Sequence, residues 1–191
     1  YNFRGELLQE LKAKGYEITV ICPPDEKNAH YFTDLGIKLL TVPMSRKGTN
    51  IKEDLQLVKN LFKVYKKEKF DLVFHYTIKP NIYGTLAAKL AGIKSIAITT
   101  GLGYVFLHNN ITSLIAKFMY KFSLAFANEV WFLNDDDMNI FLDKDLITER
   151  QAFKLPSEGI NTKRFVPKEK SRKDNKTVFL MIARVLYDKG F

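Results

Sequence analysis

The chain has 191 residues, of which 46% are hydrophobic and 27% are charged, and its formal net charge is +9. This length holds one domain of ordinary size plus part of another, and the composition excludes a wholly disordered chain. No uninterrupted apolar stretch reaches the roughly 18 residues of a membrane-spanning helix. The single cysteine, Cys22, excludes an internal disulfide and fits a reducing compartment.

Helical and strand-like patterns alternate along the chain. Expected strands lie at 16–22, 37–43, 71–76, 94–100, 129–134, 151–156 and 176–183, and expected helices at 3–15, 28–36, from 51 onward, 80–92, 111–128 and 135–144. The strands are nearly continuous apolar runs, which is typical of sheets covered on both faces. The alternation predicts an α/β fold with a Rossmann-like parallel sheet and helices on both faces. The polar run at 167–176 predicts a domain boundary, with one domain at 1–166 and a second starting at 167.

Two of the expected helices carry unusual patterns. The helix after Asn50 starts with a capping box completed by Glu53. The predicted buried stripe of this helix consists of Ile51, Leu55, Val58, Phe62 and Tyr65. The other face is rich in lysine and is either solvated or attracted to an anionic membrane; it consists of Lys52, Lys59, Lys63 and Lys66. The helix at 111–128 is apolar nearly all round, which predicts a core helix and leaves an interfacial anchor as the alternative.

Candidate ligand-binding residues follow the strands, because ligands of parallel α/β sheets bind beyond the carboxyl ends of the strands. In the stretch "TTGLGYVF", Gly101 and Gly103 let the backbone approach a ligand closely, next to Thr99 and Thr100. A turn without a ligand remains the alternative. The dinucleotide fingerprint is excluded there because Phe106 stands where a third glycine is needed.

The stretch "HYTIKPN" follows another strand and contributes His75 and Lys79. An imidazole at this place acts as a base, as a hydrogen-bond partner or as a structural residue. His30 and His108 are expected at the surface, and no histidine pair has metal-ligand spacing.

Asp135 and Asp137 form a D-x-D pattern that could hold a divalent cation beside a nucleotide diphosphate. Asn134, however, is typical of a helix N-cap followed by carboxylates in the first turn, and we favour this structural interpretation.

Positive charge is concentrated in two stretches: residues 46–94 hold eleven Lys and Arg against four Asp and Glu, and residues 151–191 hold ten against four. Such a surface suits anionic lipid or a phosphorylated small molecule, and the absence of a recognition motif disfavours nucleic acid.

Several motifs in their order resemble the retaining GT-B glycosyltransferases of the family-4 type, in the subgroup that builds bacterial surface polysaccharides. They are "YNFRGELLQELKAKGYEITVICP" at 1–23, "HYTIKPNIYGTLAAKLAGI" at 75–93, "ITTGLGYVF" at 98–106, "SEGINTKRFVP" at 157–167 and "ARVLYDKGF" at 183–191. The resemblance covers essentially the whole chain. It implies the acceptor-side half of a GT-B fold, without its first strand and cut just inside the donor-binding domain, so that the fragment alone is expected to be inactive.

The resemblance also implies roles for particular residues. Arg184 and Lys189 match the pair that binds the diphosphate of a nucleotide-sugar donor, in a reaction that needs neither metal nor cofactor. The acceptor would contact the loops that contain His75, Lys79, Thr99, Thr100, Gly101 and Gly103. No catalytic residue is assigned, because no histidine stands near Thr100. Glu158 departs from the asparagine that is usual in the family.

The resulting expectation is a cytoplasmic enzyme, peripheral on the inner face of the plasma membrane, that transfers a sugar from a nucleotide-diphosphate sugar to a lipid-linked glycan in capsule, O-antigen or exopolysaccharide synthesis. Three alternatives stay open at this stage. They are a GT-B sugar-nucleotide epimerase, an NAD-dependent oxidoreductase in which Asp25 contacts a ribose, and a non-catalytic basic module that binds membranes.

Overall fold

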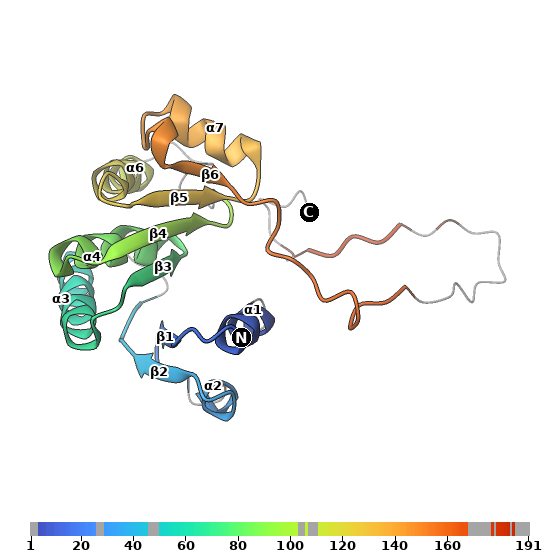
Figure 1. Ribbon diagram of the computed structural model, residues 1–191. Coiled ribbons are helices and arrows are strands. Elements are labelled where there is room, and N and C mark those ends of the chain that lie inside the picture. Colours follow the sequence, from blue (N-terminus) through green and yellow to red (C-terminus); the bar gives the residue numbers. More distant parts are fainter. Residues whose placement is uncertain are drawn as a thin grey trace. The chain divides into compact units, whose positions relative to one another are not determined.

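The computed structural model describes residues 4–25, 29–45, 50–102, 106, 111–167, 177, 179–183 and 185. The chain divides into two compact units, residues 1–159 and 160–191. All the described helices and strands lie in the first unit (Figure 1). In chain order they are α1 (Gly5–Ala13), β1 (Thr19–Cys22), α2 (Ala29–Asp34), β2 (Lys38–Thr41), α3 (Ile51–Glu68), β3 (Leu72–Tyr76), η1 (Pro80–Gly84), α4 (Thr85–Ala91), β4 (Lys94–Thr99), α6 (Ile111–Leu124), β5 (Glu129–Phe132), α7 (Asp135–Asp143), η2 (Glu149–Gln151) and β6 (Ala152–Lys154).

The strands form two parallel sheets, β1–β2 and β3–β4–β5–β6. In the first sheet Val20 lies opposite Leu39, and in the second Tyr76 lies opposite Ile98, which lies opposite Trp131. Among the described strands, none joins β1 to β3 (Figure 1). The prediction of a parallel α/β fold is confirmed.

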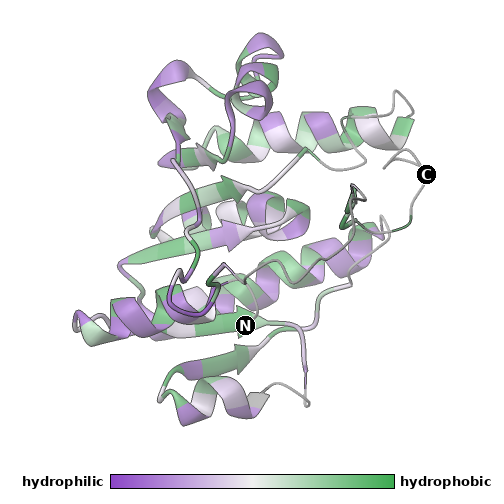
Figure 2. Cartoon of the chain, turned by 90° about the vertical axis from the view of Figure 1, so that its right-hand side faces the viewer, coloured by the Kyte–Doolittle hydropathy of each residue, from purple (hydrophilic) through white to green (hydrophobic). Residues whose placement is uncertain are grey.

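One face of the four-stranded sheet carries the hydrophobic core. Ala97 and Val130 lie opposite each other on this face, and both are fully buried. They pack with residues of η1, α6 and α7, while Val73 on the same face packs with α3 and α4. The strands are mostly hydrophobic, whereas the helices mix hydrophobic and hydrophilic residues (Figure 2). The other face holds the contacting rings of Phe74, Trp131 and Phe153.

Asn50 caps helix α3, with a side-chain contact to Glu53 rather than the predicted capping box, and the helix buries only part of the predicted stripe. The Asn50 side chain accepts a hydrogen bond from the backbone N–H of Lys52 and donates one to Glu53. The buried residues are Asp54, Leu57, Leu61 and Tyr65. Ile51 and Leu55, which we expected to be buried, are exposed. The prediction was wrong for these two residues but right for Tyr65, and Val58 and Phe62 are half-buried against the same core. Two apolar stripes begin in the first turns of this helix, and periodicity alone does not show which one faces the sheet.

Helix α6 also corrects an expectation. Tyr120 and Leu124 are buried in the core, as a core helix requires. The opposite side of α6, however, is exposed and consists of large apolar side chains. The helix is therefore a core helix on one side only, and no described helix is long and apolar enough to cross a bilayer.

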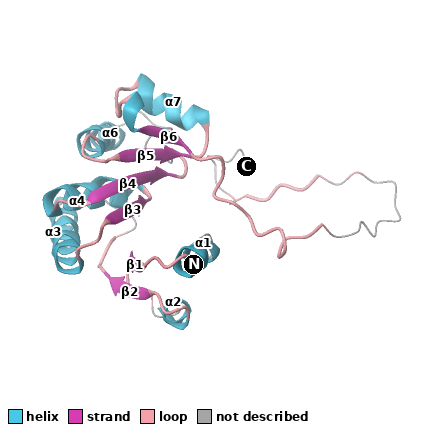
Figure 3. Cartoon of the chain, in the orientation of Figure 1, coloured by secondary structure: helices cyan, strands magenta, loops and turns pink. Residues whose placement is uncertain are grey.

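In the unit formed by residues 160–191, the described part of the segment 176–183 does not form the strand that we predicted there. Its described residues 177 and 179–183 have no regular secondary structure (Figure 3). Phe179 and Ile182 are almost fully exposed. A strand is stabilised by a neighbouring strand, and the described part of this unit contains none. The predicted division at residue 166, with a donor domain beyond it, stays a prediction.

Candidate functional site

A pocket of about 440 Å³ opens beyond the carboxyl ends of β2 and β3. Its walls come from the segment that follows β2, from the first turns of α3 and from the segment that follows β3. Residues that line it include Met44, Lys52, Asp54, Leu57, Asn60 and Lys79. Because ligands of parallel α/β sheets bind at this edge, the pocket is the best candidate for a functional site among the described residues.

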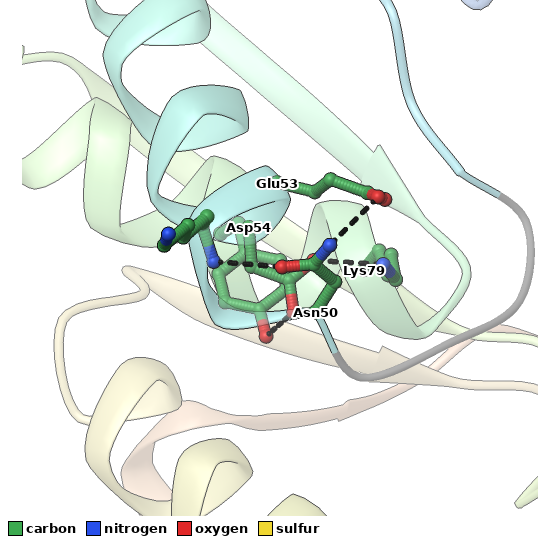
Figure 4. A network of polar contacts seen from close by, with 6 residues as sticks. Asn50, Glu53, Asp54 and Lys79 are labelled. Carbon is green, nitrogen blue, oxygen red and sulfur yellow. Dashed lines mark hydrogen bonds and ion pairs between the residues drawn. The ribbon is translucent and has the colours of Figure 1, made fainter.

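Asp54 is the centre of a polar network at this pocket (Figure 4). Its carboxylate accepts a hydrogen bond from Lys79 Nζ at 2.7 Å and another from the Tyr83 hydroxyl at 2.7 Å. Only 7% of the Asp54 surface is exposed. Burial, and secondarily the hydrogen bond to Asp54, raise the pKa of Tyr83 above its ordinary value, so this phenol stays protonated and donates.

The network joins three elements and fixes the position of one cation. Asp54 belongs to α3, Lys79 lies just before η1, and Tyr83 lies within η1. The Lys79 ammonium is held against the buried carboxylate, and its side chain is 17% exposed. Lys52 and Glu53 add one charge of each sign to the pocket wall. The pocket thus presents neighbouring positive and negative groups next to apolar atoms of Met44 and Leu57.

The backbone between β3 and η1 is strained. Thr77 has φ of 73°, which is uncommon for a residue with a branched side chain. Its carbonyl accepts a hydrogen bond from Asn81 N at 3.0 Å, which starts η1. Such strain is costly, and it persists where surrounding contacts enforce it. Here it redirects the chain from Tyr76, the last residue of β3, to Lys79 at the pocket.

A second polar cluster lies at the end of β3. The Arg4 guanidinium lies 3.7 Å from the centre of the Tyr76 ring and donates a hydrogen bond to Glu158 at 2.6 Å. Tyr76 is the last residue of β3 and Glu158 follows β6, so this cluster connects the start of α1 to the carboxyl ends of two strands. The residue that departs from the usual asparagine therefore has a structural partner in Arg4.

His75 is buried, with 4% of its surface exposed. Its Nε2 atom lies 3.0 Å from the Tyr65 hydroxyl, and its Nδ1 atom lies 3.3 Å from the Thr85 hydroxyl. Burial lowers the pKa of His75 to about 4, so the ring is neutral near pH 7. This placement favours the structural interpretation of His75 and gives no support to direct contact with an acceptor.

The predicted binding loop after β4 is described only in part. Thr99 is buried, and its hydroxyl has no hydrogen-bond partner among the described residues. Thr100 is exposed, and Gly101 has φ of 143°, a conformation that disfavours other residues. Gly103 lies outside the described residues. The role of this loop in acceptor binding stays a prediction.

The D-x-D pattern has the structural role that we favoured. Asn134 caps α7, and its side-chain oxygen accepts a hydrogen bond from Asp137 N at 2.7 Å. The Asp137 carboxylate accepts one from the Asn134 side chain. Asp135 forms an ion pair with Lys154. Both carboxylates thus have partners within the protein.

The predicted donor-binding residues, Arg184 and Lys189, lie outside the described residues. The structure does bring together Lys79 with two residues that the sequence reasoning missed, Asp54 and Tyr83. A signal for Asp54 was available, because it lies three residues before Leu57 and seven before Leu61 on one face of α3. A carboxylate in line with a buried apolar stripe indicates a buried partner.

Comparison with known families identifies the chain. A family model described as "Glycosyl transferase 4-like" matches residues 2–134. This chain belongs to the glycosyl transferase 4-like family. The match includes the whole pocket and the Asp54 network, and it confirms the family that the sequence motifs indicated.

Two curated bacterial relatives are glycosyltransferases. The N,N'-diacetylbacillosaminyl-diphospho-undecaprenol alpha-1,3-N-acetylgalactosaminyltransferase of Campylobacter jejuni is 32% identical over 100% of this chain and 54% of its own length. The UDP-Gal:alpha-D-GlcNAc-diphosphoundecaprenol alpha-1,3-galactosyltransferase of Escherichia coli is 26% identical over 89% of this chain and 46% of its own length. The chain therefore spans about half the length of the curated relatives it matches.

Solved structures show the same fold at low identity. HepE of Anabaena, solved in complex with UDP, has a TM-score of 0.60 at 16% identity, covering 83% of this chain and 42% of HepE. The UDP-GlcNAc 2-epimerase of Methanocaldococcus jannaschii has a TM-score of 0.55 at 17% identity, covering 79% of this chain and 41% of the epimerase. A glycosyltransferase of Rickettsia africae also has this fold, with a TM-score of 0.54 at 19% identity, covering 80% of this chain and 38% of that chain. Because an epimerase and a glycosyltransferase share the fold, the fold alone does not choose between the two activities.

Proposed function

We propose that the complete gene product, meaning these residues with any flanking sequence of the same gene, transfers a sugar from a nucleotide-diphosphate sugar to a lipid-linked glycan in bacterial surface-polysaccharide synthesis. The observation that carries the proposal is the family match over residues 2–134, which contains the pocket. The names of both curated relatives support it, because each specifies transfer to a sugar on diphosphoundecaprenol.

The donor would bind through Arg184 and Lys189, as the resemblance in the last residues of the chain implies. An arginine offers a planar fork to diphosphate oxygens, and a lysine supplies a point charge. Both would stabilise the nucleoside diphosphate as it leaves and the glycosidic bond breaks. A reaction with retained configuration and no metal ion is part of this proposal. Omission of divalent cations and addition of EDTA should then leave the rate unchanged.

The acceptor would bind at the pocket beyond β2 and β3. Sugar hydroxyls both donate and accept hydrogen bonds, so they match a wall that offers the Lys79 ammonium beside carboxylate and amide groups. The apolar atoms of Met44 and Leu57 can cover the C–H face of a sugar ring. In this arrangement Asp54 and Tyr83 are positioning residues that hold Lys79. The loop that contains Thr100 and Gly101 would provide further contacts with the acceptor.

The reaction would take place in the cytoplasm, at the inner face of the plasma membrane. The net charge of +9 supports this location, because basic surfaces are attracted to anionic lipid headgroups. The lysine-rich side of α3, with Lys59, Lys63 and Lys66, is exposed as this attraction requires. The names of the curated relatives also support a location at a membrane, because each specifies an acceptor linked to the lipid undecaprenol.

The deciding experiment combines donor binding with product analysis on the complete gene product. UDP-galactose and UDP-N-acetylgalactosamine are tested for thermal stabilisation, and then for transfer to a polyprenyl-diphosphate-linked sugar. We expect a donor to stabilise the wild-type protein and the Lys144→Ala/Arg150→Ala control, but not an Arg184→Ala/Lys189→Ala variant. The control removes the same charges from two exposed positions, one just after α7 and one in η2.

Two outcomes would overturn the proposal. Conversion of the nucleotide sugar to its epimer without any acceptor would assign the epimerase activity. Stabilisation by nicotinamide cofactors, with no response to any nucleotide sugar, would assign an oxidoreductase. The anomeric configuration of a transferred sugar, measured by NMR, tests the retaining mechanism separately.

A further inference from the structure

The exposed side of helix α6 consists largely of apolar residues, which is unusual for a helix side that faces water. Tyr120 and Leu124 point into the core, and Ser113 and Ser123 are also buried. On the opposite side lies a continuous set of exposed apolar residues, here called the outer stripe: Ile111, Leu114, Ile115, Phe118 and Phe122. Phe126, just beyond the helix, continues it. Their spacing of three or four residues places all of them on one side of the helix.

Helix α6 is thus apolar on both sides. A surface helix of a globular protein turns its apolar side to the core and its polar side to water. In α6 two serines lie on the buried side, while Phe118 and Phe122 are 68% and 51% exposed. Contiguous exposed apolar surface of this kind marks a contact with another protein or with a membrane.

The charges on and around α6 indicate which contact this is. The sequence of α6, "ITSLIAKFMYKFSL", contains two lysines and no acidic residue. Lys121 is exposed next to the outer stripe, and the Lys89 ammonium lies 5.5 Å from the centre of the Phe126 ring. An apolar surface with a basic border complements an anionic bilayer, because aliphatic and aromatic groups enter the acyl region while ammonium groups stay among the phosphates.

Helices α3 and α4, which lie in the same layer as α6, also carry exposed apolar residues. Helix α4 contacts both α3 and α6, so the three helices form one layer. Leu90 of α4 and Ile51 and Leu55 of α3 are exposed, and α3 also carries exposed lysines. A contact between two copies of this face would bring lysines against lysines, which is unfavourable. The charge pattern therefore favours lipid over a second copy of the chain.

We propose that the outer stripe of α6 inserts into the interfacial region of an anionic membrane, with the helix lying in the plane of the bilayer. Interfacial helices of this type bury their apolar face about 5–10 Å into the headgroup and acyl boundary. The contact differs from long-range attraction through the α3 lysines, because it depends on apolar side chains. It also stands independently of the donor and of the reaction.

Vesicle sedimentation of the complete gene product tests the proposal. Vesicles of phosphatidylglycerol and phosphatidylethanolamine are compared with vesicles of phosphatidylcholine alone. We expect Phe118→Ser/Phe122→Ser to weaken binding to the anionic vesicles roughly tenfold or more, because two large apolar side chains no longer insert. The control, Leu7→Ser/Tyr16→Ser, makes two comparable changes at exposed positions in and just after α1, and it should bind like the wild type.

A fluorescent label shows insertion directly. With Cys22, the one cysteine of these 191 residues, and any cysteine of the flanking sequence replaced by serine, an environment-sensitive dye is attached at Ile115→Cys or, for comparison, at Phe165→Cys. The dye at position 115 should shift to the blue when anionic vesicles are added, and the dye at position 165 should not. Because residue 115 is exposed, the label does not disturb the core.

Three results would overturn the proposal. The first is equal vesicle binding by the wild type and Phe118→Ser/Phe122→Ser, and the second is the absence of any wild-type binding to anionic vesicles. The third is a lipid-free dimer, seen by analytical ultracentrifugation, that Phe118→Ser/Phe122→Ser dissociates, because the outer stripe would then be a protein interface. Circular dichroism of each variant confirms that it is folded.

Discussion

The two sheets contain similar strands but differ in burial. In β4 five of six residues are buried, whereas all four residues of β1 are only half-buried. Strand β4 has a paired strand on each side, and α4 packs against it. Strand β1 pairs only with β2 among the described strands. Pairing on both edges together with a covering helix therefore accounts for the greater burial of β4.

The β1–β2 sheet is held to the rest of the unit by few contacts. Val42, just after β2, belongs to the core cluster of α3 and α4, and Lys38 of β2 forms an ion pair with Glu68 of α3. A two-stranded sheet is marginally stable on its own. We therefore expect β1–β2 to open locally at a lower free energy than β3–β6.

The largest expected effect separates the two sheets. Phe132 in β5 is fully buried and packs against Phe141 of α7 with ring centres 5.1 Å apart. Phe132→Ala should lower the free energy of opening of β3–β6 by about 3–5 kcal/mol, through lost apolar burial and the cavity that remains. Hydrogen exchange of the complete gene product, resolved by mass spectrometry, measures this free energy segment by segment.

The matched change in the other sheet is Leu39→Ala. Leu39 of β2 is half-buried, so its truncation should cost only about 1–2 kcal/mol and should affect mainly β1–β2. Equal losses for the two variants, or loss of protection in both sheets after Leu39→Ala, would show that the sheets open as one unit.

The next effect concerns pH and the buried imidazole in β3. The pKa of His75 is lowered from 6.5 to about 4 by burial. Between these two values the unfolded chain binds a proton that the folded chain does not, so stability rises with pH. The stabilisation is complete above pH 6.5 and is lost as the pH falls toward 4, with a total of about 3 kcal/mol. Hydrogen exchange of β3 and β4 at several pH values measures this dependence.

His75→Gln isolates the contribution of the imidazole from that of the carboxylates. The amide can still hydrogen-bond with the Tyr65 and Thr85 hydroxyls but does not titrate. The difference in stability between wild type and variant should therefore shrink as the pH falls from 6.5 to 4. A constant difference across this interval would mean that His75 is protonated in the folded protein, contrary to its buried environment.

The sequence predicted the order and type of the elements well, because period and punctuation are local properties. For example, Pro23 directly follows β1 and Pro80 is the first residue of η1, so a local signal coincides with an element boundary in both places. The sequence did not predict which stripe of α3 is buried, since Ile51–Leu55 and Leu57–Leu61 both have helical spacing. That choice depends on how the helix packs against β3 and α4, which is a tertiary property.

The site was predicted only where it depends on topology. Lys79 was correctly placed at the carboxyl edge of the sheet, because it follows a strand. Its partners Asp54 and Tyr83 come from other segments, and their approach depends on the bend at Thr77. His75 was assigned to the same edge, but its position within β3 turns its ring inward, since alternate residues of a strand face opposite sides.

A smaller effect is expected at the Asp54 network, which belongs to the well-buried half. Asp54→Ala leaves the Lys79 ammonium and the Tyr83 hydroxyl without their acceptor in a largely buried place. We expect a loss of about 2–3 kcal/mol in the stability of α3 and η1. The control Asp143→Ala removes an exposed carboxylate from α7 and should cost less than about 0.5 kcal/mol.

A double-mutant cycle then separates the ion pair from the rest of the network. If Lys79 is held by Asp54, Asp54→Ala/Lys79→Met should cost less than the sum of the two single changes, by about 1 kcal/mol or more. Additive losses would place the contribution of Asp54 in its contact with Tyr83 alone.

The smallest effect tests the connection between the two sheets. The Lys38 side chain is 53% exposed and that of Glu68 is 14% exposed, so solvent screens much of their attraction. Lys38→Met should lower the protection of β1–β2 amides by about 0.5 kcal/mol and leave β3–β6 unchanged. Lys154→Met, which breaks the more exposed pair with Asp135, should have no measurable effect. A loss of protection in β3–β6 after Lys38→Met would mean that this ion pair stabilises the whole unit, and that the two-stranded sheet contributes more to the fold than its burial indicates.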